Sequence, residues 1–130
     1  MLELTINEKV YPFKFGLGFV REINKTMSKP IEGVTNGKQD VGLQFAVAAI
    51  LDEDPVGLVD VLDIANKTEM PRVTKKQLDA YIEDESTDLE ALFAEVLDNL
   101  KSANATKKVT AAVLAMVEEA KAEAAAKAAE

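Results

Sequence analysis

The chain has 130 residues, of which 48% are hydrophobic and 29% are charged, a composition typical of one soluble globular domain. It contains no cysteine and no histidine, which excludes disulfide frameworks, zinc sites built on these residues and histidine-based acid–base catalysis. Its 15 basic and 23 acidic residues give a net charge of −8, which argues against DNA or RNA as a partner.

The sequence shows no sign of export or of membrane insertion. Its first residues contain neither the basic region nor the apolar segment of a secretory signal. The longest run without a charged residue, residues 41–51, is much shorter than the ~20 residues needed to span a bilayer. We therefore expect a cytoplasmic protein without a membrane partner.

Alternating apolar residues predict a β-hairpin over about residues 2–15. Residues 2–6 alternate between apolar and polar, residues 7–9 have the composition of a turn, and residues 10–15 are rich in aromatic side chains. Proline has no backbone N–H to donate, so Pro12 places its strand at a sheet edge. A lone hairpin is marginally stable in water, so we expect this one to pack against the helices that follow.

After the hairpin the apolar spacing changes to that of helices, and about five to six helices are expected over residues 17–120. Phe19 and Ile23 lie on one face of a short first helix. Residues 28–37 contain proline and glycine and predict a loop. Residues 41–51 are apolar nearly all round, which favours a buried central helix.

Three later helix starts carry capping signals. Asp54 followed by Pro55 is typical of an N-cap and a first helical residue. Residues 74–77 form a Thr-x-x-Gln capping box, and residues 87–90 form a Thr-x-x-Glu capping box. The second box opens residues 89–100, whose large apolar side chains follow the clearest helical stripe in the chain.

The last helix is expected from about Thr106, with an apolar stripe of valine, alanine and methionine that is narrower than that of its neighbour. A stripe of this kind suits a second surface as well as a core, so we expect weak self-association. Residues 121–130 contain only alanine, lysine and glutamate, which favour helix but offer nothing large to bury. We therefore expect one domain over residues 1–120 and a C-terminal extension over residues 121–130.

Two motifs are partial matches to ligand sites. Residues 16–21 follow a predicted strand, but Arg21 replaces the third glycine of a dinucleotide fingerprint. Residues 52–63 match an EF-hand loop in part, but Val56 removes a ligand and Pro55 begins a helix too early. The chain also offers no nucleophile beside a base. We therefore expect no catalytic residue, no cofactor and no metal site.

Negative charge is concentrated in one segment. Residues 77–100 contain eight acidic residues and no basic one, whereas the rest of the chain carries 15 of each sign. Such a segment can serve solubility alone, bind a basic protein partner or mimic nucleic acid toward a DNA-binding target. As candidates for partner contact we single out Asp79, Glu83, Glu90 and Glu95.

Several segments, rather than one sharp motif, carry a family resemblance. They are residues 4–7, 11–16 (Tyr-Pro-Phe-Lys-Phe-Gly), 19–24, 41–45, 59–67 and 98–107. Together, over about residues 1–117, they resemble the tail assembly chaperones of long-tailed, siphovirus-type phages and prophages of Gram-positive bacteria.

The resemblance implies a non-structural protein that binds the tape measure protein, a long helical chain that sets tail length. Such a chaperone keeps the tape measure protein soluble in the cytoplasm of the bacterial host and is absent from the mature virion. The family often also makes a longer frameshifted product, which would add contact with the major tail protein. Two other functions stay open: a structural head–tail or tail-completion adaptor, and an acidic nucleic-acid mimic.

Overall fold

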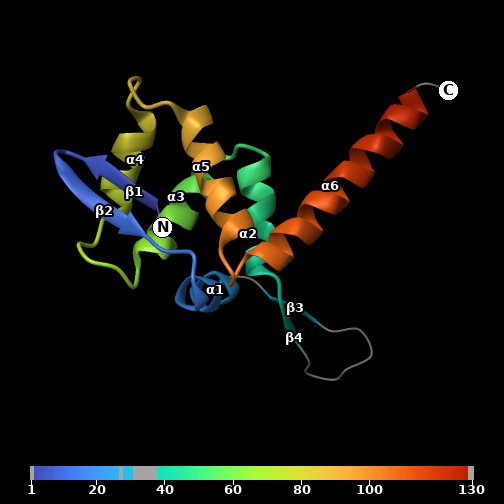
Figure 1. Cartoon of the computed structure of the whole chain (residues 1–130), viewed down its shortest axis with the longest axis horizontal. Coiled ribbons are helices and arrows are strands. Elements are labelled where there is room, and N and C mark those ends of the chain that lie inside the picture. Colours follow the sequence, from blue (N-terminus) through green and yellow to red (C-terminus); the bar gives the residue numbers. More distant parts are fainter. Residues whose placement is uncertain (1, 27, 31–37, 129–130) are drawn as a thin grey trace.

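The computed structural model describes residues 2–26, 28–30 and 38–128 of the chain. In these residues it contains six α-helices and two antiparallel two-stranded sheets (Figure 1). In chain order the elements are β1 (Leu2–Ile6), β2 (Lys9–Phe13), α1 (Leu17–Asn24), β3 (Ser28–Pro30), β4 (Lys38–Asp40), α2 (Gly42–Leu51), α3 (Pro55–Asn66), α4 (Lys75–Glu83), α5 (Leu89–Ser102) and α6 (Lys107–Ala128). The expected fold, a mainly helical small domain that begins with a β-hairpin, is confirmed.

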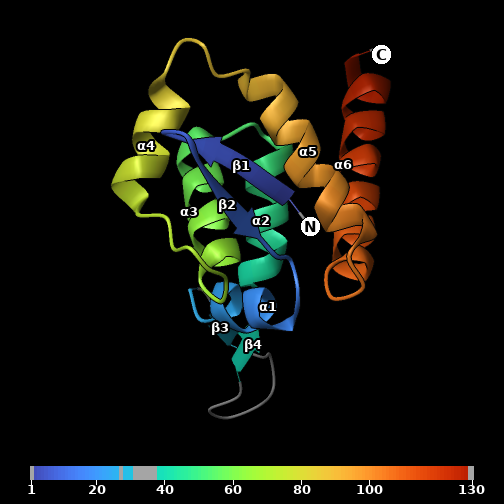
Figure 2. The same cartoon turned by 60° about the vertical axis from the view of Figure 1, so that its left-hand side comes forward.

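β1 and β2 form the expected hairpin and lie over the helices as an outer layer (Figure 2). Asn7 and Glu8 connect the strands with positive φ angles of 53° and 68°, the backbone signature of a two-residue type I′ turn. The buried side chains of the hairpin are Leu2, Leu4, Ile6, Tyr11 and Phe13. Because β2 contacts α3 and β1 contacts α5, the hairpin closes one side of the hydrophobic core.

α2 is the central helix, in contact with α1, α3, α5 and α6. Its buried side chains include Leu43, Val47 and Ile50. The predicted buried central helix is confirmed, but one part of its surface stays open, because Phe45 is 55% exposed. An apolar composition all round a helix does not reveal which part of its surface the neighbouring elements leave open.

The connection between α1 and α2 contains strands that the sequence analysis did not predict. β3 and β4 pair in antiparallel fashion, with Ser28 opposite Asp40 and Pro30 opposite Lys38. The predicted loop is therefore wrong for residues 28–30, while residues 31–37 of that loop lie outside the described residues. The strands are short and do not alternate between apolar and polar residues, so the pattern that identifies a strand is missing.

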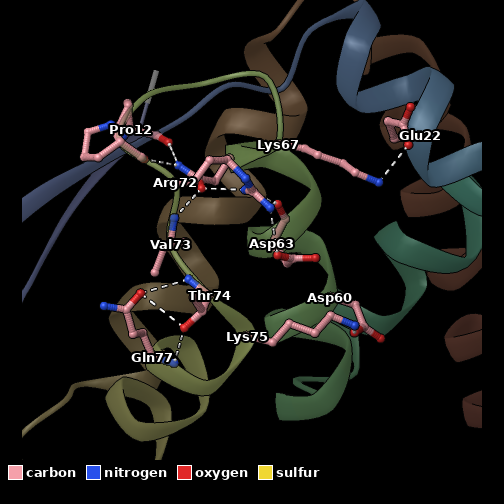
Figure 3. Close-up of polar contacts among 12 residues, drawn as sticks. Pro12, Glu22, Asp60, Asp63, Lys67, Arg72, Val73, Thr74, Lys75 and Gln77 are labelled. Atoms are coloured by element: carbon pink, nitrogen blue, oxygen red, sulfur yellow. Dashed lines mark hydrogen bonds and ion pairs between the residues drawn. The ribbon is translucent and has the colours of Figure 1, made fainter.

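Two of the predicted helix starts are confirmed. The carboxylate of Asp54 accepts a hydrogen bond from the N–H of Val56 at 3.1 Å, and Pro55 is the first residue of α3. Thr74 and Gln77 form both hydrogen bonds of a capping box at the start of α4 (Figure 3).

The capping box predicted at residues 87–90 is wrong. Asp88 is the N-cap of α5 and accepts a hydrogen bond from the N–H of Ala91 at 3.1 Å. Thr87 instead donates its hydroxyl to the carbonyl oxygen of Tyr81 at 2.6 Å. The carboxylate of Asp88 therefore caps α5, and the hydroxyl of Thr87 stabilises the turn between α4 and α5.

α5 and α6 bury stripes of unequal width. The buried residues of α5 are Leu92, Phe93, Val96 and Leu100. α6 buries only Thr110 and Val113, and Met116 is 67% exposed. α6 then continues to Ala128 without another buried residue and projects from the rest of the domain (Figure 1).

We predict that the end of α6 is dispensable for folding. A chain ended after Ala120 should unfold within roughly 5 °C of the full-length protein, about 1 kcal/mol for a domain of this size. The reason is that residues 121–128 form an exposed stretch of helix that has no large apolar side chain to bury. Thermal unfolding followed by circular dichroism measures the difference.

A chain ended before Thr110, which loses both buried residues of α6, is the contrasting control and should unfold at a much lower temperature. A larger fall on truncation after Ala120 would show that the extension packs on the domain or on a neighbouring copy.

Candidate partner-binding surface

Two acidic residues of the segment that partly matched an EF-hand loop form ion pairs within the protein. Asp60 lies 3.0 Å from Lys75, and this pair links α3 to α4. Asp63 lies 3.4 Å from Arg72, which precedes α4 (Figure 3). In the part of the chain that the structure describes, no three acidic side chains are grouped so that they could hold a metal ion.

The residues that partly matched a dinucleotide fingerprint join β2 to α1, with Gly16 as the N-cap of α1. Beside this junction, a hollow of about 730 Å³ opens between residues 14–17 and residues 99–105. Its charged lining residues are Lys14 and Glu69, which balance each other. This hollow therefore has no charge pattern that complements a basic or an acidic ligand.

A different surface combines exposed apolar side chains with acidic ones. Phe45 of α2 is 55% exposed, and Val56 of α3 is 71% exposed. Each lines one of two hollows, of about 290 Å³ and 400 Å³. Because both hollows are also lined by Asp60 and Lys75, they adjoin. We call the two together the α2–α4 groove.

Three helices supply most of the α2–α4 groove. The first hollow is lined by Ile23, Thr26, Gly42, Phe45, Ala46, Ala49, Gly57, Asp60, Val61, Ile64 and Lys75. The second hollow is lined by Pro55, Val56, Val59, Asp60, Lys75, Asp79, Ile82 and Glu83. α2 and α3 approach closely here because Gly57 has no side chain, and a Cβ at Gly57 would lie 2.7 Å from that of Ala49. The groove is mainly apolar along α2 and α3 and mainly charged along α4.

The ion pair of Lys75 with Asp60 lies where the two hollows adjoin. The hydrogen bond from Lys75 to Asp60, with further help from the charges of Asp63 and Asp79, raises the pKa of Lys75 above its ordinary value. Lys75 is therefore a cation at neutral pH. Its side chain is 59% exposed and that of Asp60 is 51% exposed, so the pair adds little to stability.

The structure divides the four acidic residues that the sequence singled out. Asp79 and Glu83 lie one turn apart on α4, and both line the α2–α4 groove. Glu95 lines another hollow, beside β1. Glu90 is exposed on α5 and lines neither of these hollows. One acidic segment of the sequence therefore contributes to at least two separate surfaces.

Sequence reasoning missed the two apolar residues of the groove that are most exposed. Phe45 belongs to a run that is apolar nearly all round, and Val56 directly follows a capped helix start. A large apolar residue in the first turn of a helix, outside its buried face, is a weak signal of an exposed patch. No signal in the sequence distinguishes Phe45 from its buried neighbours.

Within the described residues, none of the helices has both the length and the apolar character required to cross a membrane. The fold is a small helical domain in which two exposed apolar side chains, Phe45 and Val56, line a groove that also carries acidic residues. Grooves of this kind are surfaces on which proteins bind amphipathic helices of other chains.

Comparison with known protein families identifies the chain. A family model described as phage tail assembly chaperone protein, TAC, matches residues 3–114, a range that extends from β1 into α6 and includes every residue of the α2–α4 groove. The chain belongs to the family of phage tail assembly chaperones, so the family named in the resemblance is confirmed. Neither the curated proteins nor the solved structures that were compared with the chain gave a match.

Proposed function

We propose that this chaperone binds the tape measure protein of its phage and keeps it soluble until the tail tube forms around it. The observation that carries the proposal is the family match over residues 3–114. A long helical client has apolar faces that need cover before its final partners are in place. The exposed apolar side chains of the α2–α4 groove support the proposal, because they can supply such cover.

In this proposal the acidic segment steers the encounter with basic stretches of the client. Asp79, Glu83, Glu90 and Glu95 are all exposed, so their charges act on molecules that approach through solvent. Charges of this kind affect the association rate and its salt dependence more than they affect the stability of the protein itself.

Co-expression tests the proposal directly. The tape measure protein expressed alone should be insoluble, and with this chain it should remain in solution and co-purify, because its apolar faces are then covered. The measurement is the amount of tape measure protein in the soluble fraction and in the purified complex. An unrelated acidic protein of similar size is the control. If the chain and the tape measure protein do not associate, and solubility is no better than with the control, the proposed function is wrong.

Further properties belong to the same proposal. The chaperone acts in the cytoplasm of a Gram-positive host, has no catalytic activity, needs no cofactor or metal, and leaves no copy in the mature virion. It self-associates weakly through α6, where Met116 is exposed. A longer frameshifted product, where one is made, would add contact with the major tail protein.

Two alternative functions predict other results. A structural adaptor subunit would be found in finished particles, and a nucleic-acid mimic would compete with DNA for its partner.

A further inference from the structure

We infer that the α2–α4 groove binds one face of an amphipathic helix whose flanking residues are lysine or arginine. The inference rests on the proposed function, because it names the kind of tape measure segment that docks and the surface that receives it. The family match alone does not identify a surface. The surface is identified by two observations: Val56 lines the same hollow as Asp79 and Glu83, and the hollow lined by Phe45 adjoins it at Asp60 and Lys75.

The apolar side chains of the groove supply the attraction. Phe45 and Val56 come from different helices, and the hollows that they line adjoin at Asp60 and Lys75. One apolar face of a client can therefore cover both side chains together. Removal of apolar surface from water is the main favourable term in binding of this kind.

The occupant is a helix rather than an extended segment. Nearly all of the lining residues lie in α1, α2, α3 and α4, so the groove presents helix side chains and no strand edge. An extended client would leave backbone N–H and C=O groups without partners against such a surface, which is unfavourable. A helix satisfies most of these groups internally.

The charges of the groove specify basic flanking residues. Three carboxylates and one ammonium group line the groove, which gives a net charge of −2. Lys75 is already paired with Asp60. Among the described residues, no ion pair involves Asp79 or Glu83. Because these two carboxylates lie one turn apart on α4, they match lysine or arginine residues spaced by one turn along the edge of a client helix.

A second copy of this chain is a poorer match for the groove. The exposed apolar residue of α6, Met116, is followed by the exposed acidic residues Glu118 and Glu119. These carboxylates would face the acidic side of the groove and oppose docking.

The test compares two double variants within the groove with two controls outside it, all in the full-length chain. F45Q/V56Q removes the apolar contact, and D79K/E83K reverses the charge. E90K/E95K is the charge comparison outside the groove, since it makes the same charge change in the same acidic segment and weakens long-range steering without altering the groove. M116Q is the control for an exposed apolar side chain on α6. Each variant is co-expressed with the tape measure protein, and association rates are measured with a tape measure fragment that the wild-type chain holds in solution.

We expect the two groove variants to fail in different ways. F45Q/V56Q should reduce the co-purified client at least about tenfold, because a large aromatic side chain buried at the centre of a contact, here Phe45, contributes much of the binding free energy. D79K/E83K should slow association about tenfold at low salt and flatten its salt dependence. E90K/E95K loses only its share of the long-range steering and should slow association by less than about threefold, and M116Q should leave the rate unchanged. Thermal unfolding of all four variants should remain close to that of wild type, because the replaced side chains are exposed.

The outcomes separate the inference from the proposed function. If the wild-type chain does not hold the client, the proposed function fails, and the inference fails with it. If the wild-type chain and both groove variants hold the client equally well, only the inference is overturned. Loss of binding in M116Q, or equal slowing in E90K/E95K, would also overturn it in favour of α6 or of overall charge. If F45Q/V56Q does not fold, V56Q alone provides the apolar test.

Discussion

Replacement of Gly42 with alanine should destabilise the protein by about 3 kcal/mol, although alanine is normally the better helix former. Gly42 is buried where α2 crosses the end of α1. A Cβ at this position would overlap the carbonyl oxygen of Ile23 and would lie 2.7 Å from its carbonyl carbon and 2.8 Å from the Cα of Asn24. All three atoms belong to the backbone, so the helices themselves must move apart.

The same crossing contains a hydrogen bond that caps α2 from a distance. The side-chain oxygen of Asn24 accepts a hydrogen bond from the N–H of Leu43 at 3.0 Å, while Val41 at the N-cap position provides no side-chain cap. A wider crossing would break this bond as well. Because Gly42 and Ile23 both line the α2–α4 groove, the crossing also determines the shape of the groove.

Thermal or denaturant unfolding of Gly42→Ala measures the effect, which should appear as a fall in melting temperature of roughly 15 °C. Gly16→Ala is the control, because the nearest atom to its new Cβ is the flexible end of Lys14 at 3.3 Å. The control should change stability by less than about 1 kcal/mol. A Gly42→Ala variant as stable as the control would show that α1 and α2 do not approach so closely.

Replacement of Asn66 with alanine should also cost about 3 kcal/mol, because several buried groups lose their hydrogen-bond partner at once. Asn66 is 0% exposed. Its amide nitrogen donates to the carbonyl oxygens of Pro12 at 2.9 Å and Pro71 at 3.0 Å. Its oxygen accepts from the N–H of Val73 at 2.7 Å and from Arg72 at 2.6 Å. This single side chain therefore joins β2, α3 and the segment that leads into α4.

Two further variants identify the cause of this effect. Asn66→Asp retains an acceptor for Val73 but cannot donate to the two carbonyl oxygens, so it should remain clearly destabilised. Asn99→Ala, at a partly exposed site in α5, should change stability by no more than about 0.5 kcal/mol. The free energies of unfolding from denaturant titrations are the quantities to compare. If Asn66→Ala and Asn99→Ala were equally stable, the buried hydrogen bonds would not be what holds these segments together.

The elements that could be predicted from the sequence are those whose signals are local. The alternation and turn of residues 2–13 predicted the hairpin, because strand pairing across a two-residue turn involves near neighbours. Asp54, Thr74 and Gln77 marked helix starts, because a cap bonds within the first turn. The stripe of residues 89–100 predicted α5 and its buried face, and the extended pattern of several segments indicated the family.

The contacts between residues far apart in the chain became visible only in the folded structure. Asn66 bonds to Pro12 across 54 positions, and Gly42 meets the backbone of Ile23, contacts that no local pattern encodes. The side chains of Phe45 and Val47 are equally apolar in the sequence, yet one is exposed and the other is buried. The acidic residues of segment 77–100 are likewise close together in the sequence, although the fold divides them between separate surfaces. Periodicity records where a residue lies around its own helix, whereas exposure depends on which other elements pack there.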